Sequence, residues 1–513
     1  MHTPALPQTR RSFMNQLALG SAVALHSRAI LGTAVAAPET RPPAPPASSN
    51  VIHRENAQQG TTDWLLRRTD ITPPHPLWHM FGLRSPKIEG YCSHSSIRSG
   101  EELTVYVSTA PSAAFTLEVY RMGYYGGTGG RLMTRFGPER GRTQPTPEAG
   151  PKRVIHCQWE PSLKFTIPSE WVSGVYVGKL TEQNEGNESY LIFIVRDDRR
   201  ADFLFQCSDM TWQAYNRWPY NHSLYCNGEI DHFTDPGVGV GIDRPYGKYT
   251  QLADQTLSLG SGEWFLTEFP LAFWLEQQGY DVSYISNWDT HGDPAGLRRA
   301  AGWMSVGHDE YWTGEMFRHV QEAIRDGLNV AFLSANSVAT RIEVTPGSDE
   351  RTGPAFERAG DFEPRENTLI GGQSPNPVVG GGDWVCRAPE HWLFTGTGMK
   401  HAEGIPGLVG WEFHGEPADI PGLQVVASDI TDGRRHPREA KAGDPLHASQ
   451  FASTIYSGPK GNIVFNAGTC WWSDGLSEPP GYQRSDWYTP RFGPDARVQR
   501  ITANLLDRMR QRF

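Results

Sequence analysis

Tyr311 and Glu310 follow an apolar run at residues 303–306, and they carry the oxygen donors that a hard metal ion prefers. A second tyrosine, Tyr215, follows another short apolar run further upstream. Phenolate and carboxylate together favour a highly charged ion such as Fe(III), which in turn keeps the tyrosines deprotonated. Such an ion polarises a carbonyl group and lowers the pKa of a bound water. A second interpretation stays open, because aromatic residues in a tryptophan-rich chain mostly pack in the core or form surfaces that stack on sugars.

Other kinds of catalytic site fit this region less well. The segment Ser305-Val306-Gly307-His308-Asp309 has no serine or cysteine in the slot that a nucleophile elbow requires. The glycines at 237–241 have no helix after them, and an H-E-x-x-H zinc motif is missing. His308 and Glu310 are therefore candidates for moving protons, while a structural histidine that is hydrogen-bonded near the strand end is the alternative for His308.

The elements around these residues predict where the side chains meet. Between residues 302 and 336 the pattern is a strand, a loop, a helix from Thr313 to Gly327 and a second strand at 330–333. Ligands of such α/β units bind beyond the carboxyl ends of the strands. We therefore expect four polar segments that follow apolar runs to converge at one edge of a sheet. They are residues 209–216, 287–291, 308–311 and 334–336.

The pattern changes once along the chain. Short alternating strands separated by Gly and Pro, from about residue 88 to residue 195, predict an immunoglobulin-like β-sandwich. From residue 201 on, helices alternate with short buried strands, which predicts a mostly parallel sheet covered on both faces. One of these helices is expected at residues 263–278, and its pattern is that of an amphipathic helix. Residues 343–385 are rich in Gly, Pro and charge and are interpreted as a long loop or insertion. The predicted parts are a signal peptide at 1–36, a Pro-rich linker and irregular segment at 37–85, the sandwich at 86–198, and the α/β domain with loop insertions at 199–513.

The N-terminus predicts export. Residues 9–14 match the twin-arginine pattern, residues 17–25 form a short apolar segment, and Ala34-Val35-Ala36 offers a cleavage site. We expect a periplasmic or secreted protein without membrane insertion. A formal net charge of −10 argues against nucleic acid as the main partner. The six cysteines include no C-x-x-C pair, so one or two disulfides and buried free thiols both stay open.

Several longer motifs resemble one known family. They are TWQAYN at 211–216 followed by Ser223-Leu224-Tyr225, GHDEYW at 307–312, HWLFTGTG at 391–398 and FNAGTCWWSDGL at 465–476. Together with residues 89–103 and 119–127 they resemble, in the same order, the large (beta) subunit of N,N-dimethylformamidase and its relatives. The resemblance implies a β-sandwich joined to an α/β domain like that of class I glutamine amidotransferases, with a flavodoxin-like sheet.

The resemblance also implies a chemistry. The family's enzyme cleaves small amides with a mononuclear iron held by two tyrosines and a glutamate. Carried over, the metal ligands are Tyr215 in TWQAYN, Tyr311 in GHDEYW and Glu412 in GLVGWEF, with Glu390 as the alternative carboxylate. The implied partners are a small-molecule amide and either further copies of the chain or a small subunit.

Two functional hypotheses follow. In the first, the chain is an exported, metal-dependent hydrolase of amide C–N bonds, and the metal is iron, expected as Fe(III). In the second, it is a non-catalytic protein that binds carbohydrate or another ligand on an aromatic rim. The rim residues are Trp212, Trp218, Tyr220, Trp288 and Trp312.

Overall fold

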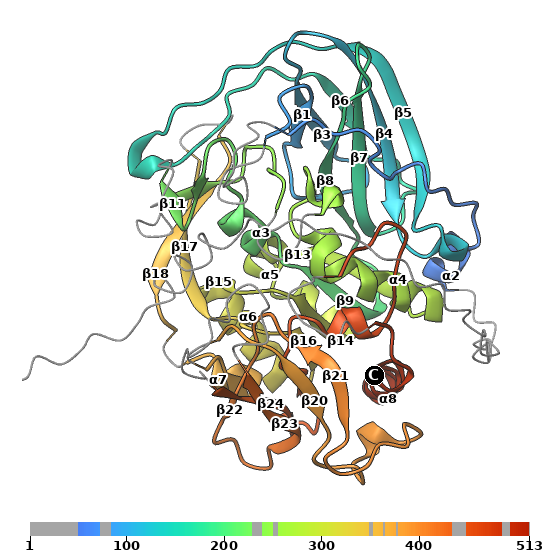
Figure 1. Cartoon of the computed structure of the whole chain (residues 1–513), viewed down its shortest axis with the longest axis vertical. Helices are drawn as coiled ribbons and strands as arrows, with labels where there is room; N and C mark the ends of the chain where they lie inside the picture. Colours follow the sequence, from blue (N-terminus) through green and yellow to red (C-terminus); the bar gives the residue numbers. More distant parts are fainter. Residues whose placement is uncertain are drawn as a thin grey trace, which may run out of the picture.

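The computed structural model shows a mixed α/β protein whose two largest sheets have five and seven strands. It describes residues 50–71, 84–227, 239–249, 255–347, 352–362, 365–375, 378–432, 448–484 and 493–511. The export signal predicted at 1–36 lies outside these residues. In Figure 1 the five-stranded sheet lies at one end of the molecule, and the seven-stranded sheet lies in the other half.

The N-terminal half is built from two facing sheets. One has the order β1-β3-β6, and the other β2-β8-β7-β4-β5. Alternate apolar residues of both sheets, such as Val105, Leu117 and Phe193, share one buried core. The strands are β1 (Glu89–Cys92), β2 (Ser96–Arg98), β3 (Glu102–Ser108), β4 (Ala114–Met122), β5 (Gly130–Arg140), β6 (Leu163–Thr166), β7 (Gly174–Glu182) and β8 (Glu188–Arg196).

The second half contains the predicted parallel sheet, in the order β13-β9-β14-β16-β25-β24-β23. The first five strands of that order are parallel, and β24 and β23 add antiparallel edges. The strands are β9 (Ala201–Cys207), β13 (Val282–Ser286), β14 (Ala300–Gly307), β16 (Asn329–Ser334), β23 (Gln424–Asp432), β24 (Ala448–Ser457) and β25 (Ile463–Asn466). The helices that follow the strands of this half are α3 (Asp209–Tyr215), α5 (Asn287–Gly292), α6 (Gly314–Arg325) and α8 (Ala496–Arg510).

The helix expected at residues 263–278 differs from its prediction. Its first turn, Trp264–Glu268, is a π-helix, and α4 (Phe269–Gln278) follows it. The side chains of both segments are buried on every face up to Glu276, so the helix is not amphipathic. The reason is that the N-terminal half packs on the face expected to meet water: Arg121 of β4 pairs with Glu276 of α4 at 2.8 Å, and both side chains are fully buried.

The interpretation of residues 343–385 as a loop is wrong. Strands β17 (Thr340–Thr345) and β18 (Ala355–Gly360) form an antiparallel pair there, and β12 (Gly239–Gly241) and β15 (Tyr311–Thr313) complete a four-stranded sheet in the order β12-β18-β17-β15. Figure 1 shows β17 and β18 at one side of the molecule. Their polar residues point outward, which hides the strand pattern in the sequence.

Two further expectations concern thiols and membranes. All six cysteines are free thiols, and five of them are buried. The buried-thiol alternative therefore describes the structure, rather than the disulfides that export made plausible. Among the described residues, no helix combines the length and apolar character that crossing a membrane requires.

Candidate metal centre

The carboxyl ends of the parallel strands meet around Asp309, as the sequence predicted. The fully buried carboxylate of Asp309 accepts hydrogen bonds from Gln206 at the end of β9 (2.7 Å), from Asn287 after β13 (3.0 Å) and from Ser305 of β14 (2.8 Å). The Ser305 hydroxyl also contacts that of Ser334 at the end of β16 (2.9 Å). Burial raises the pKa of Asp309, although these hydrogen bonds oppose it. Asp309 thus connects four strand ends through hydrogen bonds. The adjacent residues His308 and Glu310 contribute the side chains of the candidate site.

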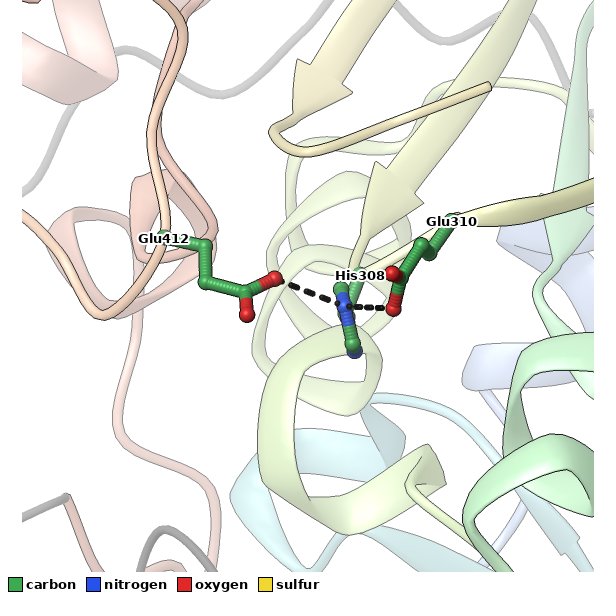
Figure 2. A group of neighbouring side chains, drawn as sticks. All are labelled: His308, Glu310 and Glu412. Atoms are coloured by element: carbon green, nitrogen blue, oxygen red, sulfur yellow. Dashed lines mark ion pairs between the residues drawn. The ribbon is translucent and has the colours of Figure 1, made fainter. Parts of the chain in front are cut away.

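His308 lies among three carboxylates. Its Nε2 is 3.0 Å from Oε2 of Glu412 and 3.2 Å from Oε2 of Glu310 (Figure 2). Its Nδ1 is 3.3 Å from Oε2 of Glu263, and the histidine ring is fully buried. Burial alone would lower the pKa of His308, but the charge of Glu412 and the contacts with Glu263 and Glu310 outweigh it and raise the pKa well above its usual value.

A glycine sets the position of His308. Gly307 ends β14 with φ +68°, in the left-handed region, and a Cβ added there would collide with the side chain of Thr267. Only glycine reaches this backbone conformation at low cost. The turn directs His308 away from the strand and toward Glu412.

Glu412 comes from a distant part of the chain and is held by the loop that follows β16. Asn336 donates a hydrogen bond from Nδ2 to Oε2 of Glu412 at 2.6 Å, and the backbone N–H of Ser337 donates to Nε2 of His414 at 3.2 Å. Within this loop Asn336 has φ +47° and Val338 has φ +57°. The left-handed region is unusual for a β-branched residue, so the loop stores strain next to the site.

Three tyrosine hydroxyls adjoin the same cluster. The hydroxyl of Tyr215 donates to Oε2 of Glu310 at 2.5 Å and lies 3.0 Å from the hydroxyl of Tyr225. The Tyr225 hydroxyl is also 3.4 Å from Oε1 of Glu310 and is hydrogen-bonded to the hydroxyl of Tyr311. Thr211 of α3 fixes this arrangement, because its hydroxyl accepts the backbone N–H groups of Glu310 (3.0 Å) and Tyr311 (3.2 Å).

The donor set fits a metal ion. Ligand atoms of His308, Glu310 and Glu412 lie within 4.8 Å of one another, and all three residues are buried. Although Nε2 of His308 is close to two carboxylates, it makes no aligned hydrogen bond with any described residue. Three buried carboxyl groups share one imidazole, and a cation bound among them would favour their ionised form. Carboxylate and phenol oxygens are the ligands that hard ions prefer.

Comparison with known families agrees with the motifs. A family model described as N,N-dimethylformamidase beta subunit-like, C-terminal, matches residues 116–485, most of the chain. The chain belongs to this family. No curated protein matches it. The matched region of this N,N-dimethylformamidase beta subunit-like protein contains His308, Glu310, Glu412 and all three site tyrosines.

The structure brings most of the predicted site residues together. Tyr215, His308, Glu310 and Glu412 are joined by direct contacts, and Tyr311 reaches the cluster through Tyr225. The alternative carboxylate does not join it, since Glu390 is exposed at the surface. Sequence reasoning missed two members of the cluster, Tyr225 and Glu263. The sequence could have indicated Tyr225, because it lies in the motif segment Ser223-Leu224-Tyr225 that follows TWQAYN. No motif or spacing indicated Glu263.

The aromatic rim is not present as predicted. Trp212, Trp218 and Trp312 are buried, and Trp288 is half-buried. Only Tyr220 is well exposed, at 53%. The indole N–H groups explain part of this, because Trp212 donates to Glu268 and Trp218 donates to Glu89 inside the protein. These tryptophans cannot stack on a sugar without unfolding.

Proposed function

We propose that the protein is a metal-dependent hydrolase that cleaves the C–N bond of small amides. The observation that carries the proposal is the buried cluster of His308, Glu310 and Glu412 beside three tyrosine hydroxyls, in a chain of the N,N-dimethylformamidase beta subunit-like family. The loss of the aromatic rim removes the main support for a sugar-binding protein.

The residues that would hold the metal are two tyrosines and a glutamate, with iron as the proposed ion. The resemblance assigns Tyr215, Tyr311 and Glu412 to this role. The contacts favour Glu310 as the carboxylate, because it touches the hydroxyls of Tyr215 and Tyr225 and also lies beside His308. A bound metal ion would polarise the amide carbonyl and make a water more acidic.

The remaining groups are placed to move protons. In this proposal Glu412 takes a proton from the attacking water, and His308 gives a proton to the nitrogen of the leaving amine. Glu263 would keep His308 oriented through its Nδ1, and Asn336 would keep Glu412 in place. Hydrolysis then consumes one water and releases a carboxylic acid and an amine.

Finer assignments belong to the same proposal. We infer that the N-terminal sheets form an immunoglobulin-like sandwich and that the second half resembles class I glutamine amidotransferases, with the boundary near residue 198. The family's description names a beta subunit, which favours a small subunit as partner. Export by the twin-arginine route, to the periplasm or beyond, completes the proposal and rests on residues 9–36 alone.

Metal content decides the central point. Protein purified after natural export should contain about one iron per chain and show a visible charge-transfer band from tyrosinate. Tyr215→Phe should weaken and shift the band, the double variant Tyr215→Phe/Tyr311→Phe should remove it, and Glu310→Gln should lower the iron content more than Glu412→Gln does. The control is Tyr120→Phe, since Tyr120 is a buried tyrosine of the sandwich, outside the cluster. Absence of any bound metal, together with unchanged amide hydrolysis in Tyr215→Phe, would refute the proposal.

A further inference from the structure

Arg358 of β18 lies at the tyrosine side of the cluster. Its Nη2 donates to the hydroxyl of Tyr311 at 3.0 Å, and its guanidinium carbon lies 4.5 Å from the centre of the Tyr225 ring. Arg358 is nevertheless exposed to solvent. Arg358 therefore connects the outside of the protein with the buried cluster.

The strand pairing explains how this arginine reaches the site. Tyr311 pairs with Thr340 of β17, and Ile342 of β17 pairs with Arg358 of β18. Arg358 is thus two strands away from Tyr311 within one sheet, a distance of about 10 Å between strand axes. The long arginine side chain spans this distance and lies over the ring of Tyr225.

Arg358 has no carboxylate partner in the part of the chain that the structure describes. Two buried arginines elsewhere have one, since Arg121 pairs with Glu276 and Arg84 pairs with Glu89, whereas the buried Arg244 donates to backbone carbonyl oxygens instead. A guanidinium carries five N–H donors in a planar fork. One donor of Arg358 is used on Tyr311, and no described residue accepts from its Nε or Nη1. The unused edge matches the two oxygens of a carboxylate.

We propose that Arg358 determines the specificity of the site and that the substrate is a small amide that also carries a carboxylate. This inference rests on the proposed amide hydrolysis. The carboxylate would bind the free edge of the guanidinium, and the amide would reach the cluster of His308, Glu310 and Glu412. Arg358, Tyr311, Tyr225 and Glu310 are joined by three successive hydrogen bonds.

This chain of contacts limits the size of the substrate. It places Glu310 no more than about 9 Å from the guanidinium, at about 3 Å per hydrogen bond. A carboxylate and an amide separated by two or three carbons fit within that distance. In a long peptide the terminal carboxylate lies farther from most of the amide groups. N,N-dimethylsuccinamate is a suitable probe of this kind, and N,N-dimethylacetamide is its neutral counterpart.

The test compares the two probes on the full-length, metal-loaded protein. The wild type should have a higher kcat/KM for dimethylsuccinamate than for dimethylacetamide. Arg358→Gln should lower the ratio of kcat/KM for dimethylsuccinamate to kcat/KM for dimethylacetamide about 30-fold to 100-fold, as expected for losing charged hydrogen bonds to the carboxylate of only one probe. Arg358→Lys should restore part of the loss. The matched control is Arg341→Gln, because Arg341 lies on the neighbouring β17 and pairs with Glu343 instead.

A binding measurement separates this inference from the proposed hydrolysis. Titration calorimetry with dimethylsuccinamate should show binding to the wild type and to Arg341→Gln, but not to Arg358→Gln. If no amide is hydrolysed while this binding still requires Arg358, the proposed function fails and the carboxylate site stands. If amides are hydrolysed but Arg358→Gln weakens both probes equally, or binding does not depend on Arg358, the inference is overturned and the hydrolase stands.

Discussion

The ion pair between Arg121 and Glu276 joins the two halves of the protein, and its removal should be costly. Both side chains are fully buried. Glu276 accepts hydrogen bonds from Nη1 and Nη2 of Arg121 at 3.1 and 2.8 Å, and from Tyr284 at 2.9 Å and Asn56 at 2.8 Å. Arg121→Met keeps much of the arginine's volume but leaves the carboxylate of Glu276 buried without its cation.

Removing one partner of a buried ion pair typically costs about 3–5 kcal/mol, since the remaining charge stays desolvated. We expect the free energy of unfolding of Arg121→Met to fall by about that amount, measured by urea denaturation at pH 7. The double variant Arg121→Met/Glu276→Leu should be more stable than Arg121→Met, because no unpaired charge remains. The exposed pair of Lys164 and Glu102, at 2.9 Å, is the control, and Lys164→Ala should cost less than about 1 kcal/mol.

Two results would contradict this reasoning. One is a loss for Arg121→Met no larger than that for Lys164→Ala, which would mean that water reaches Glu276 in the folded protein. The other is a double variant that is less stable than Arg121→Met, which would mean that packing and hydrogen bonds of Glu276, rather than its unpaired charge, determine the cost.

Three further predictions address other sites. Burial raises the pKa of Asp474 to about 7, above its usual value near 3.9. The free energy of unfolding should therefore fall by up to about 4 kcal/mol as the pH rises from about 4 to 7, because the folded state resists ionisation of this carboxyl group. Asp474→Asn should flatten this part of a plot of unfolding free energy against pH, and an unchanged slope would contradict the assignment. Gly307→Ala should lower the free energy of unfolding by about 1–3 kcal/mol more than Gly126→Ala does. Both glycines have positive φ, but only a Cβ at position 307 would collide with a neighbour, Thr267. Equal losses would show that Thr267 moves aside. Chelation should lower the Tm of the wild type and leave that of Glu310→Gln nearly unchanged, because only a protein that binds metal gains stability from it; an equal drop in both would place the metal elsewhere.

The regular elements were accessible from the sequence because their burial is periodic. The apolar run before Gly307 and the spacing from Thr313 onward predicted β14 and α6, and Thr313 caps that helix through its side chain. The convergence of four strand ends followed from the parallel sheet alone. Local signals of this kind do not depend on what packs against an element from far along the chain.

The residues that the sequence did not reveal reach the site through tertiary contacts. Glu263 directly precedes the π-helical turn and contacts His308 from there, and no local pattern in the sequence indicates this contact. Arg358 depends on a pair of half-exposed strands in a segment rich in Gly and charge. The misread helix at 263–278 has the same origin, since the packing of Trp64 on Phe265 and of Arg121 on Glu276 buries faces that an isolated helix would expose.

The charge balance of the cluster links the site to the predicted route of export. Glu263, Glu310 and Glu412 surround His308 in a region closed to solvent, so three carboxyl groups share one imidazole as their cationic partner. Such an arrangement is costly in an empty site and favourable around a cation, because the cation removes the repulsion between carboxylates that burial strengthens. Metal binding should therefore stabilise the folded state itself, and a protein of this kind gains from folding around its metal before it leaves the cytoplasm. The twin-arginine route carries folded proteins, so export after metal loading is the expectation that connects the signal predicted at residues 9–36 with the proposed metal site.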